Sequence, residues 1–372
     1  MERLHGRVRA YAWGSRRAIA AIQGRPVPSD GPEAELWLGA HDGAPSSLAS
    51  GPLPDALAAD PDGLLGPEVA AEFGVRLPYL FKLLAADAPL SIQAHPDAAR
   101  AVEAFAAGHP SYCDAYHKPE LLVAVEEFDA LCGFRDPSAS AARLEALGVD
   151  GLKPVVEALR GGPDDAACLR GAVELLLCAP AADPAELVRA VAAADPFAAT
   201  LAAHHPGDLG VVVALLLNRV RLAAGDAVWM PAGNLHAYVR GVGMEIMAAS
   251  DNVLRGGLTP KRVDVPELLR VLRFEVLRDP VVRPVPVSPG VVTWPAPVRE
   301  FALYRATVAG GPVTLPADGP RILFCLRGRV EVDGLVLGSG EAAFVGAGEP
   351  PVTVIGAGVL FQADTATGRA AR

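Results

Sequence analysis

The sequence predicts a mainly β protein built from two jelly-roll modules, with an α-helical domain inserted into the first. Short apolar segments broken by Pro, Gly and Asp fill residues 77–134 and return at Gly210, which is typical of strands and turns. Between about Pro137 and Pro206 they give way to long Ala/Leu/Glu/Arg stretches with helical spacing. From about Phe274 onward the chain is rich in Val, Pro and Gly, which favours an all-β module.

Each expected element rests on its own local signal. Apolar runs of strand length between turn residues predict strands at Leu80–Leu84, Leu90–Gln93, Glu120–Val125, Gly210–Leu217 and Val228–Met230. A helix is expected over Ala185–Ala194, because Asp183 and Pro184 form a helix start signal. A second helix is expected near Val265–Val271, with Asp264 as its cap.

The chain also contains an internal repeat. Leu222–Gly233 aligns with Leu337–Gly348 at a constant offset of 115, and the shared pattern of a turn, a strand and a second turn resembles the late hairpin of a cupin. At the same offset His236 becomes Pro351. We therefore expect a catalytic cupin domain at 1–136 plus 206–262, a helical insertion at 137–205, and a C-terminal cupin-like β domain at 263–372 without metal ligands.

Composition excludes several classes of function. The net charge of −10 and a pI near 5.3 oppose binding to nucleic acid, whose phosphates require a basic face. Neither a signal peptide nor an apolar run long enough for a membrane span is evident, so a cytoplasmic protein with no membrane association is expected. No disulfide framework or thiolate zinc site is expected, because the five cysteines lack CxxC spacing: Cys113, Cys132, Cys168, Cys178 and Cys325.

Four residues form a candidate metal site. Gln93 and His95 are two residues apart, so on a strand their side chains leave the same face. Glu120 follows about two strands later, and His236 follows the Pro231–Gly233 turn, which we place in the opposing sheet. An amide oxygen, two imidazoles and a carboxylate suit Zn²⁺ and leave a position open for water or substrate. The alternative is that both histidines are ordinary core residues.

A second candidate site is the segment from Asp251 to Lys261. Arg255 precedes two glycines, which leave room for its guanidinium to turn into a cavity, and a Thr-Pro-Lys turn brings Lys261 close by. Three of the chain's four lysines lie in or beside these candidate segments: Lys82, Lys118 and Lys261. A compact ammonium binds phosphate as a point charge. The alternative is a polar surface loop.

Other motifs are weaker. No phosphate-binding glycine loop is present, so neither ATP nor NAD is expected. His204 and His205 lack partners at catalytic spacing and are expected at the end of the helical block, whereas Trp37 and His41 could line a pocket.

Taken together, these motifs resemble the class I mannose-6-phosphate isomerases (phosphomannose isomerases) of the cupin superfamily. The resemblance covers roughly the first 270 residues and rests on Tyr11–Ser15, Ala34–Gly39, Ile92–Pro96, His117–Glu120 and Asp251–Lys261, the last reading Asp-Asn-Val-x-Arg-x-Gly-x-Thr-Pro-Lys. It implies one Zn²⁺ per chain, bound by Gln93, His95, Glu120 and His236, with Arg255 as the active-site arginine. Lys82, Ser91, Lys118, Glu245 and Lys261 match positions around the sugar phosphate.

The implied reaction interconverts mannose 6-phosphate and fructose 6-phosphate through a cis-enediol, and it implies a role in carbohydrate metabolism and GDP-mannose biosynthesis. Arg255 and lysines would stabilise charge on the enediolate oxygen. The base that removes the C2 proton is open among Lys118, Glu245 and a zinc-bound water. The phosphate would be held by Lys82, Lys261 and a hydroxyl such as that of Ser91.

Two rival functions remain. An oxygen-using iron enzyme would share two histidines and a carboxylate, but the amide ligand and the nearby lysines argue against it. A sugar-phosphate-binding or storage protein would be expected to lack Arg255 or a ligand, and the sequence retains both. We expect a monomer or weak homo-oligomer that acts on a small sugar phosphate.

Overall fold

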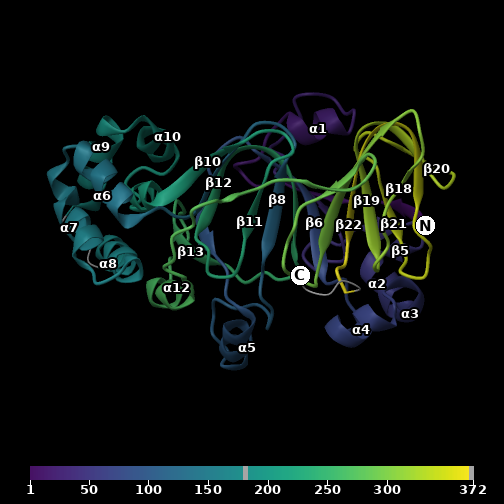
Figure 1. The fold of residues 1–372 in the computed structure, drawn as a ribbon, viewed down its shortest axis with the longest axis horizontal. Coiled ribbons are helices and arrows are strands. Elements are labelled where there is room, and N and C mark those ends of the chain that lie inside the picture. Colours follow the sequence, from purple (N-terminus) through teal and green to yellow (C-terminus); the bar gives the residue numbers. More distant parts are fainter. Residues whose placement is uncertain (179–182, 368–372) are drawn as a thin grey trace.

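The computed structural model describes residues 1–178 and 183–367, and two large antiparallel sheets dominate it (Figure 1). The mainly β fold class is thereby confirmed. In Figure 1 a group of helices lies at one end, the 11-stranded sheet in the middle and the nine-stranded sheet at the other end. Residues 179–182, within the expected helical insertion, lie outside the described residues.

The 11-stranded sheet carries the candidate site. Its longest strand pairs with β7 and β9 through its N-terminal half and with β6 and β8 through its C-terminal half, and so joins two groups of strands. The strands are β2 (Arg7–Arg9), β3 (Glu35–Leu38), β6 (Tyr79–Ala86), β7 (Ile92–Ala94), β8 (Glu120–Ala124), β9 (Phe128–Phe134), β10 (Leu217–Leu222), β11 (Ala227–Met230), β12 (His236–Ala248), β13 (Leu254–Gly257) and β14 (Val281–Val282).

The nine-stranded sheet repeats part of this plan. Its strands are β1 (Glu2–Leu4), β15 (Val285–Ser288), β16 (Val291–Thr293), β17 (Ala302–Ala309), β18 (Val313–Thr314), β19 (Arg321–Val332), β20 (Leu335–Gly338), β21 (Ala342–Val345) and β22 (Thr353–Asp364). Strands β11 and β21 occupy equivalent positions of the 115-residue repeat, and both follow a glycine with positive φ, at Gly225 and Gly340. The repeat seen in the sequence is thus a repeat of local structure.

The two sheets share a buried apolar core. Phe81 and Met244 of the first sheet belong to the same cluster as Phe324 and Phe361 of the second, and all four are at most 1% exposed. Burial of apolar surface on this scale is the main stabilising contribution to such an interface. The faces turned away from this cluster enclose separate cores within each sheet.

A block of helices lies between β9 and β10: α6 (Pro137–Ala146), η1 (Asp150–Leu152), α7 (Lys153–Gly161), α8 (Asp165–Leu177), α9 (Pro184–Ala194), α10 (Pro196–His204), α11 (Gly210–Val213) and η2 (Ala214–Leu216). The expected helix at 185–194 is confirmed as α9, and the Asp183 carboxylate caps it by accepting from the amide of Glu186.

The remaining helices lie around the ends of the strands in Figure 1, and two short strands form a separate sheet. They are α1 (Ala18–Ile22), α2 (Leu53–Ala59), α3 (Pro61–Leu64), α4 (Pro67–Phe73), α5 (Ala98–Ala106), α12 (Val265–Val271), β4 (Ser47–Leu48) and β5 (Gly51–Pro52). The predicted helix at 265–271 is confirmed, with Asp264 as its cap.

The strand predicted at Gly210–Leu217 is wrong. Residues 210–216 form α11 and η2, and only Leu217 begins a strand. The residues from Val211 to Leu217 are each at most 1% exposed, so apolar neighbours surround this run on all sides. A continuous apolar run cannot distinguish a buried strand from a buried helix, and here packing outweighs the strand preference of three valines.

Two segments cross the expected boundary between the modules. The N-terminal strand β1 pairs with β21 in the C-terminal sheet, whereas β14 pairs with β11 in the first sheet. The boundary near residue 262 stays a prediction. In the described part of the chain, no helix has the length and apolar character needed to cross a membrane.

Candidate active site

Three adjacent strands bring the first candidate residues together. In the registers of β12 with β7 and of β7 with β13, Gln93 lies opposite His236 on one side and Arg255 on the other. Directly paired residues in an antiparallel sheet point to the same face. The pairing therefore places these three side chains on one face. His236 thus shares a sheet with Gln93, and the expectation that it lies in an opposing sheet is wrong.

Three buried side chains converge next to this row. Ligand atoms of His95, Glu120 and His236 all lie within 4.8 Å of one another, and the three residues are 1%, 4% and 3% exposed. The Nε2 atoms of His95 and His236 each lie 3.2 Å from a different oxygen of the Glu120 carboxylate. Glu120 begins β8, the strand whose apolar remainder packs into the core.

Hydrogen bonds on the far side of each ring fix the imidazole tautomers. His95 Nδ1 lies 2.8 Å from the carbonyl oxygen of Asn252, and His236 Nδ1 lies 3.0 Å from that of Asn234. A carbonyl can only accept, so both Nδ1 atoms carry hydrogen, and both rings turn Nε2 toward the Glu120 carboxylate.

The charges of this cluster agree with that assignment. Burial lowers the pKa of His95 to about 4, so its ring is neutral at pH 7. Although burial alone would raise the pKa of Glu120, Lys118 and the two histidines hold it well below its usual value. The buried Nε2 of His95 has no hydrogen-bond partner. The two Nε2 atoms and the Glu120 carboxylate thus face one another, an arrangement that a metal cation would stabilise.

The donor set fits a divalent metal. Two neutral imidazole nitrogens and one carboxylate oxygen, with both rings held by carbonyl groups, are the ligands and supporting contacts typical of catalytic zinc. The sequence-predicted ligands His95, Glu120 and His236 are brought together by the structure. Gln93 lines a small hollow that Glu120 and His236 also line, which we call the metal hollow. Its amide nitrogen donates to Ser91 Oγ at 3.2 Å, and its role as a fourth ligand stays a prediction.

Two lysines next to this hollow are buried and already paired. Lys118 Nζ lies 3.0 Å from a Glu120 oxygen, and Lys82 Nζ lies 3.0 Å from Glu245 and 3.7 Å from Glu35. Although burial alone would lower it, the two glutamates keep the pKa of Lys82 above its usual value. The Glu245 carboxylate also accepts from the Tyr238 hydroxyl at 2.6 Å, and burial raises its pKa.

An open cleft of about 590 Å³ lies above the hollow, which itself measures about 80 Å³. The two share Glu35, Lys82, Leu90, Ser91, Gln93 and Lys118 as lining residues. Aromatic and cationic side chains line the rest of the cleft, including Tyr11, Trp13, Trp37, His204, His205, Arg255 and Lys261. A ligand in the cleft can therefore reach the metal hollow.

Arg255 and Lys261 differ from the buried lysines. In residues 1–178 and 183–367 neither forms an ion pair with a carboxylate, and burial alone lowers the pKa of Arg255. The glycines beside Arg255 serve packing: Gly257 has φ of +124°, and a Cβ there would lie 2.5 Å from Gly210 Cα. This close contact fixes the segment that carries Arg255. From the sequence, the glycines were expected to leave room for the guanidinium, whereas Gly257 is required by the packing of the backbone.

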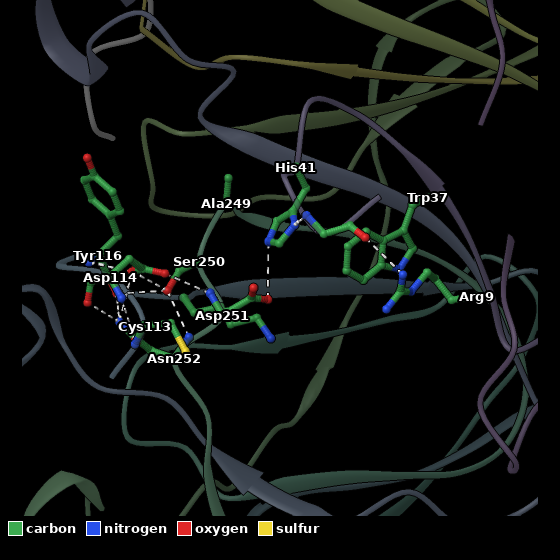
Figure 2. A network of polar contacts seen from close by, with 12 residues as sticks. Arg9, Trp37, His41, Cys113, Asp114, Tyr116, Ala249, Ser250, Asp251 and Asn252 are labelled. Atoms are coloured by element: carbon green, nitrogen blue, oxygen red, sulfur yellow. Dashed lines mark hydrogen bonds and ion pairs between the residues drawn. The ribbon is translucent and has the colours of Figure 1, made fainter. Parts of the chain in front are cut away.

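A polar network anchors the segment before Arg255 (Figure 2). The side-chain nitrogen of Asn252 donates to the carbonyls of Asp114 and Tyr116 at 2.9 and 2.8 Å, and its oxygen accepts from the amide of Cys113 at 2.9 Å. Figure 2 shows Asp251 beside this network, with His41 approaching from the other side at 3.3 Å. Asn252, whose carbonyl orients His95, is thus fully buried and fixed.

Sequence reasoning missed some of these residues. Asn252 was recognised only as part of a motif, and its contact with His95 was not predicted. The contacts of Glu35 with Lys82 and of Tyr238 with Glu245 were not predicted either. His204 ends α10 and His205 is its C-cap, as expected, but both also line the cleft.

Comparisons with known proteins point to one family of enzymes. Residues 1–137 match the family model described as phosphomannose isomerase type I, catalytic domain. The chain is 37% identical to mannose-6-phosphate isomerase of Escherichia coli (strain K12), covering 97% of this chain and 99% of that protein. It is 30% identical to mannose-6-phosphate isomerase 1 of Arabidopsis thaliana, covering 91% and 88%.

Solved structures give the same result. A crystal structure of an arginine-to-alanine variant of phosphomannose isomerase from Salmonella typhimurium matches with a TM-score of 0.91 and 34% identity, covering 98% of this chain and 99% of that one. A mannose 6-phosphate isomerase bound with zinc and yttrium matches with a TM-score of 0.89 and 35% identity over the same shares.

Proposed function

The chain belongs to the type I phosphomannose isomerases, and from this premise we propose that it interconverts D-mannose 6-phosphate and D-fructose 6-phosphate with one zinc ion per chain. The observation that carries the proposal is the convergence of His95, Glu120 and His236 beneath a cationic cleft. Zinc would be held by these residues and Gln93, and when bound it would supply positive charge that stabilises substrate oxygens.

We assign the phosphate to the end of the cleft at Arg255 and Lys261. These cations have no carboxylate partner in the described chain, whereas Lys82 and Lys118 are already paired with glutamates. A dianionic phosphate gains most from charges that no other group neutralises. Ser91 lines both the cleft and the metal hollow, so it can donate its hydroxyl to a substrate that lies between them. Lys82 then serves mainly to hold Glu245.

The reaction requires transfer of a proton within the substrate. In the open-chain aldose a base takes the proton from C2 while O1 gains a proton, which gives the cis-enediol. The base then returns its proton to C1 while the O2 hydroxyl loses its proton, which gives the ketose. Lys118 lines both the cleft and the hollow, whereas Glu245 lines only the hollow. We therefore favour Lys118 as the group that exchanges the carbon-bound proton, once its ammonium has released a proton to leave the neutral amine, with Glu245 as the alternative.

The test is turnover of mannose 6-phosphate by the purified protein before chelation, after chelation and after zinc is restored. Activity should fall with the chelator and return with zinc, and His95→Ala should abolish that response because it removes a ligand. Arg255→Ala should lose activity while it still binds zinc. Absence of turnover in the zinc-loaded wild type would overturn the proposed function.

A pair of conservative substitutions separates the two candidate bases. Lys118→Met removes the amine and Glu245→Gln removes the carboxylate, each with little change in size. Exchange of the C2 proton with deuterium from solvent should be lost in the variant that lacks the base. Retention of exchange in Lys118→Met with loss in Glu245→Gln would reverse our assignment.

A further inference from the structure

A second cationic hollow lies where the two sheets meet, away from the active site. It has a volume of about 200 Å³ and is formed by Ala124 and Val125 at the end of β8, Ala224 and Gly225 before β11, Arg305 and Thr307 on β17, Leu326 and Arg327 on β19, and Val359 and Phe361 on β22. Glu120 begins β8 and Ala124 ends it, so the hollow is roughly 13 Å along the strand from the metal ligand at 3.3 Å per residue.

The sheet register directs both arginines to this hollow. Arg327 and Thr307 pair with Val359 from opposite sides, and Arg305 lies two residues from Thr307 on the same strand. The three side chains therefore leave the same face of the nine-stranded sheet, the face that meets the first sheet. Val359 and Phe361, which pair with these residues, also line the hollow.

The charges of the two arginines are not balanced within the described residues. In the part of the chain that the structure describes, no carboxylate forms an ion pair with Arg305 or Arg327, and the buried Nε of Arg305 has no hydrogen-bond partner. Burial and the neighbouring charge of Arg327 both lower the pKa of Arg305. Arg305 is half-buried and Arg327 is exposed, so an anion next to both guanidinium groups would relieve their mutual repulsion.

The surroundings of Arg305 hold its guanidinium in place. Its Cζ lies 5.6 Å from the ring centre of Trp294, and the indole nitrogen of Trp294 donates to the carbonyl of Gly225 at 2.9 Å. Gly225 has φ of +94°, and a Cβ at this position would lie 2.9 Å from Arg305 Nη1. A side chain at position 225 would therefore displace the guanidinium from its place beside the hollow.

We propose that the hollow at Arg305 and Arg327 binds a small oxyanion of the phosphate class. Two guanidinium groups match the charge and geometry of a tetrahedral dianion, and the Thr307 hydroxyl supplies a further donor. At about 30 Å³ per water, 200 Å³ holds on the order of six waters, which is room for phosphate or a very small phosphate ester and not for a nucleotide. The anion would join both sheets at the far end of β8.

The test measures binding of labelled inorganic phosphate to the zinc-loaded protein by equilibrium dialysis at constant ionic strength. Arg327→Gln should weaken one class of site on the order of tenfold or more, because it removes a charged hydrogen bond. Arg329→Gln is the matched control: it lies on the same strand, is exposed and removes the same charge, but it does not line the hollow. Phosphate held in the active-site cleft binds equally to both variants, so failure of the proposed function does not affect the difference.

A second variant guards against a merely structural effect. Arg305→Lys keeps the charge and loses the planar fork, so it should also weaken phosphate binding, while sulfate should compete and chloride should not. Isomerase turnover without phosphate should stay at the wild-type level in Arg327→Gln. Equal phosphate binding by Arg327→Gln and Arg329→Gln, or no site beyond the one in the cleft, would overturn the proposal.

Discussion

Replacing Asn252 with Ala should weaken zinc binding although Asn252 is not a ligand. Its carbonyl oxygen accepts from His95 Nδ1, and its side chain fixes the position of that carbonyl through three short hydrogen bonds. Loss of a group that orients a metal-bound histidine typically costs about 10- to 100-fold in metal affinity, or roughly 1.4 to 2.8 kcal/mol. We expect a loss in that range.

The same substitution should reduce the free energy of unfolding. Alanine removes the hydrogen bonds to the carbonyls of Asp114 and Tyr116, the second of which keeps the Ser250 hydroxyl as a donor, and leaves the amide of Cys113 without its acceptor. At about 1 kcal/mol for each lost hydrogen bond, the metal-free protein should lose roughly 3 kcal/mol. Urea unfolding of the chelated protein measures this effect separately from zinc binding.

Asn234→Ala provides the control. Its carbonyl accepts from His236 Nδ1 at 3.0 Å in the same way. Its side-chain nitrogen, however, donates to Cys132 Sγ over 3.6 Å, which is a weak contact. Zinc affinity, measured by competition with a chromophoric chelator, should therefore stay near the wild-type value. If Asn252→Ala binds zinc as tightly as Asn234→Ala, the anchoring role is refuted.

Three further predictions concern separate parts of the molecule. Lys261→Met should raise KM for mannose 6-phosphate more than it lowers kcat, and Lys153→Met, at an exposed position of α7, should change neither; steady-state kinetics test this. Burial raises the pKa of Asp364 from 3.8 to about 8, so the folded state holds a proton that the unfolded state releases, and the free energy of unfolding should fall as pH rises from 4 to 8. Urea unfolding at pH 5 and pH 8 should show a smaller fall in Asp364→Asn. Burial raises the pKa of Cys132 to about 12, so in the native protein a thiol reagent should label exposed Cys113 and leave Cys132 unmodified, as peptide mapping would show.

Local patterns in the sequence were sufficient for several features. The 115-residue repeat became two matching strands, and helix start signals placed α9 and α12. Such signals depend only on residues close in sequence, so the sequence alone is enough to predict the local structure from them. The shared face expected for Gln93 and His95 stays a prediction, because β7 ends at Ala94, before His95.

Features that depend on distant segments could not be predicted in this way. The strand expected at Gly210–Leu217 is helical because packing against loops far along the chain decides its conformation. The contacts of Asn252 come from residues about 140 positions earlier, and no spacing rule indicates them. The pairing of Lys82 with Glu245 likewise depends on the register of β6 with β12.

The lysines show why charge placement matters more than charge number in this protein. The chain has four lysines among 33 basic residues, so arginine is its usual cation. Lys82 and Lys118 are buried, where a compact ammonium can approach the carboxylates of Glu245 and Glu120 at 3.0 Å. Because these cations neutralise the carboxylates beside the metal hollow, the unpaired charges of Arg255 and Lys261 are left for the substrate. An acidic protein can therefore attract an anion into one cleft while its remaining surface repels it.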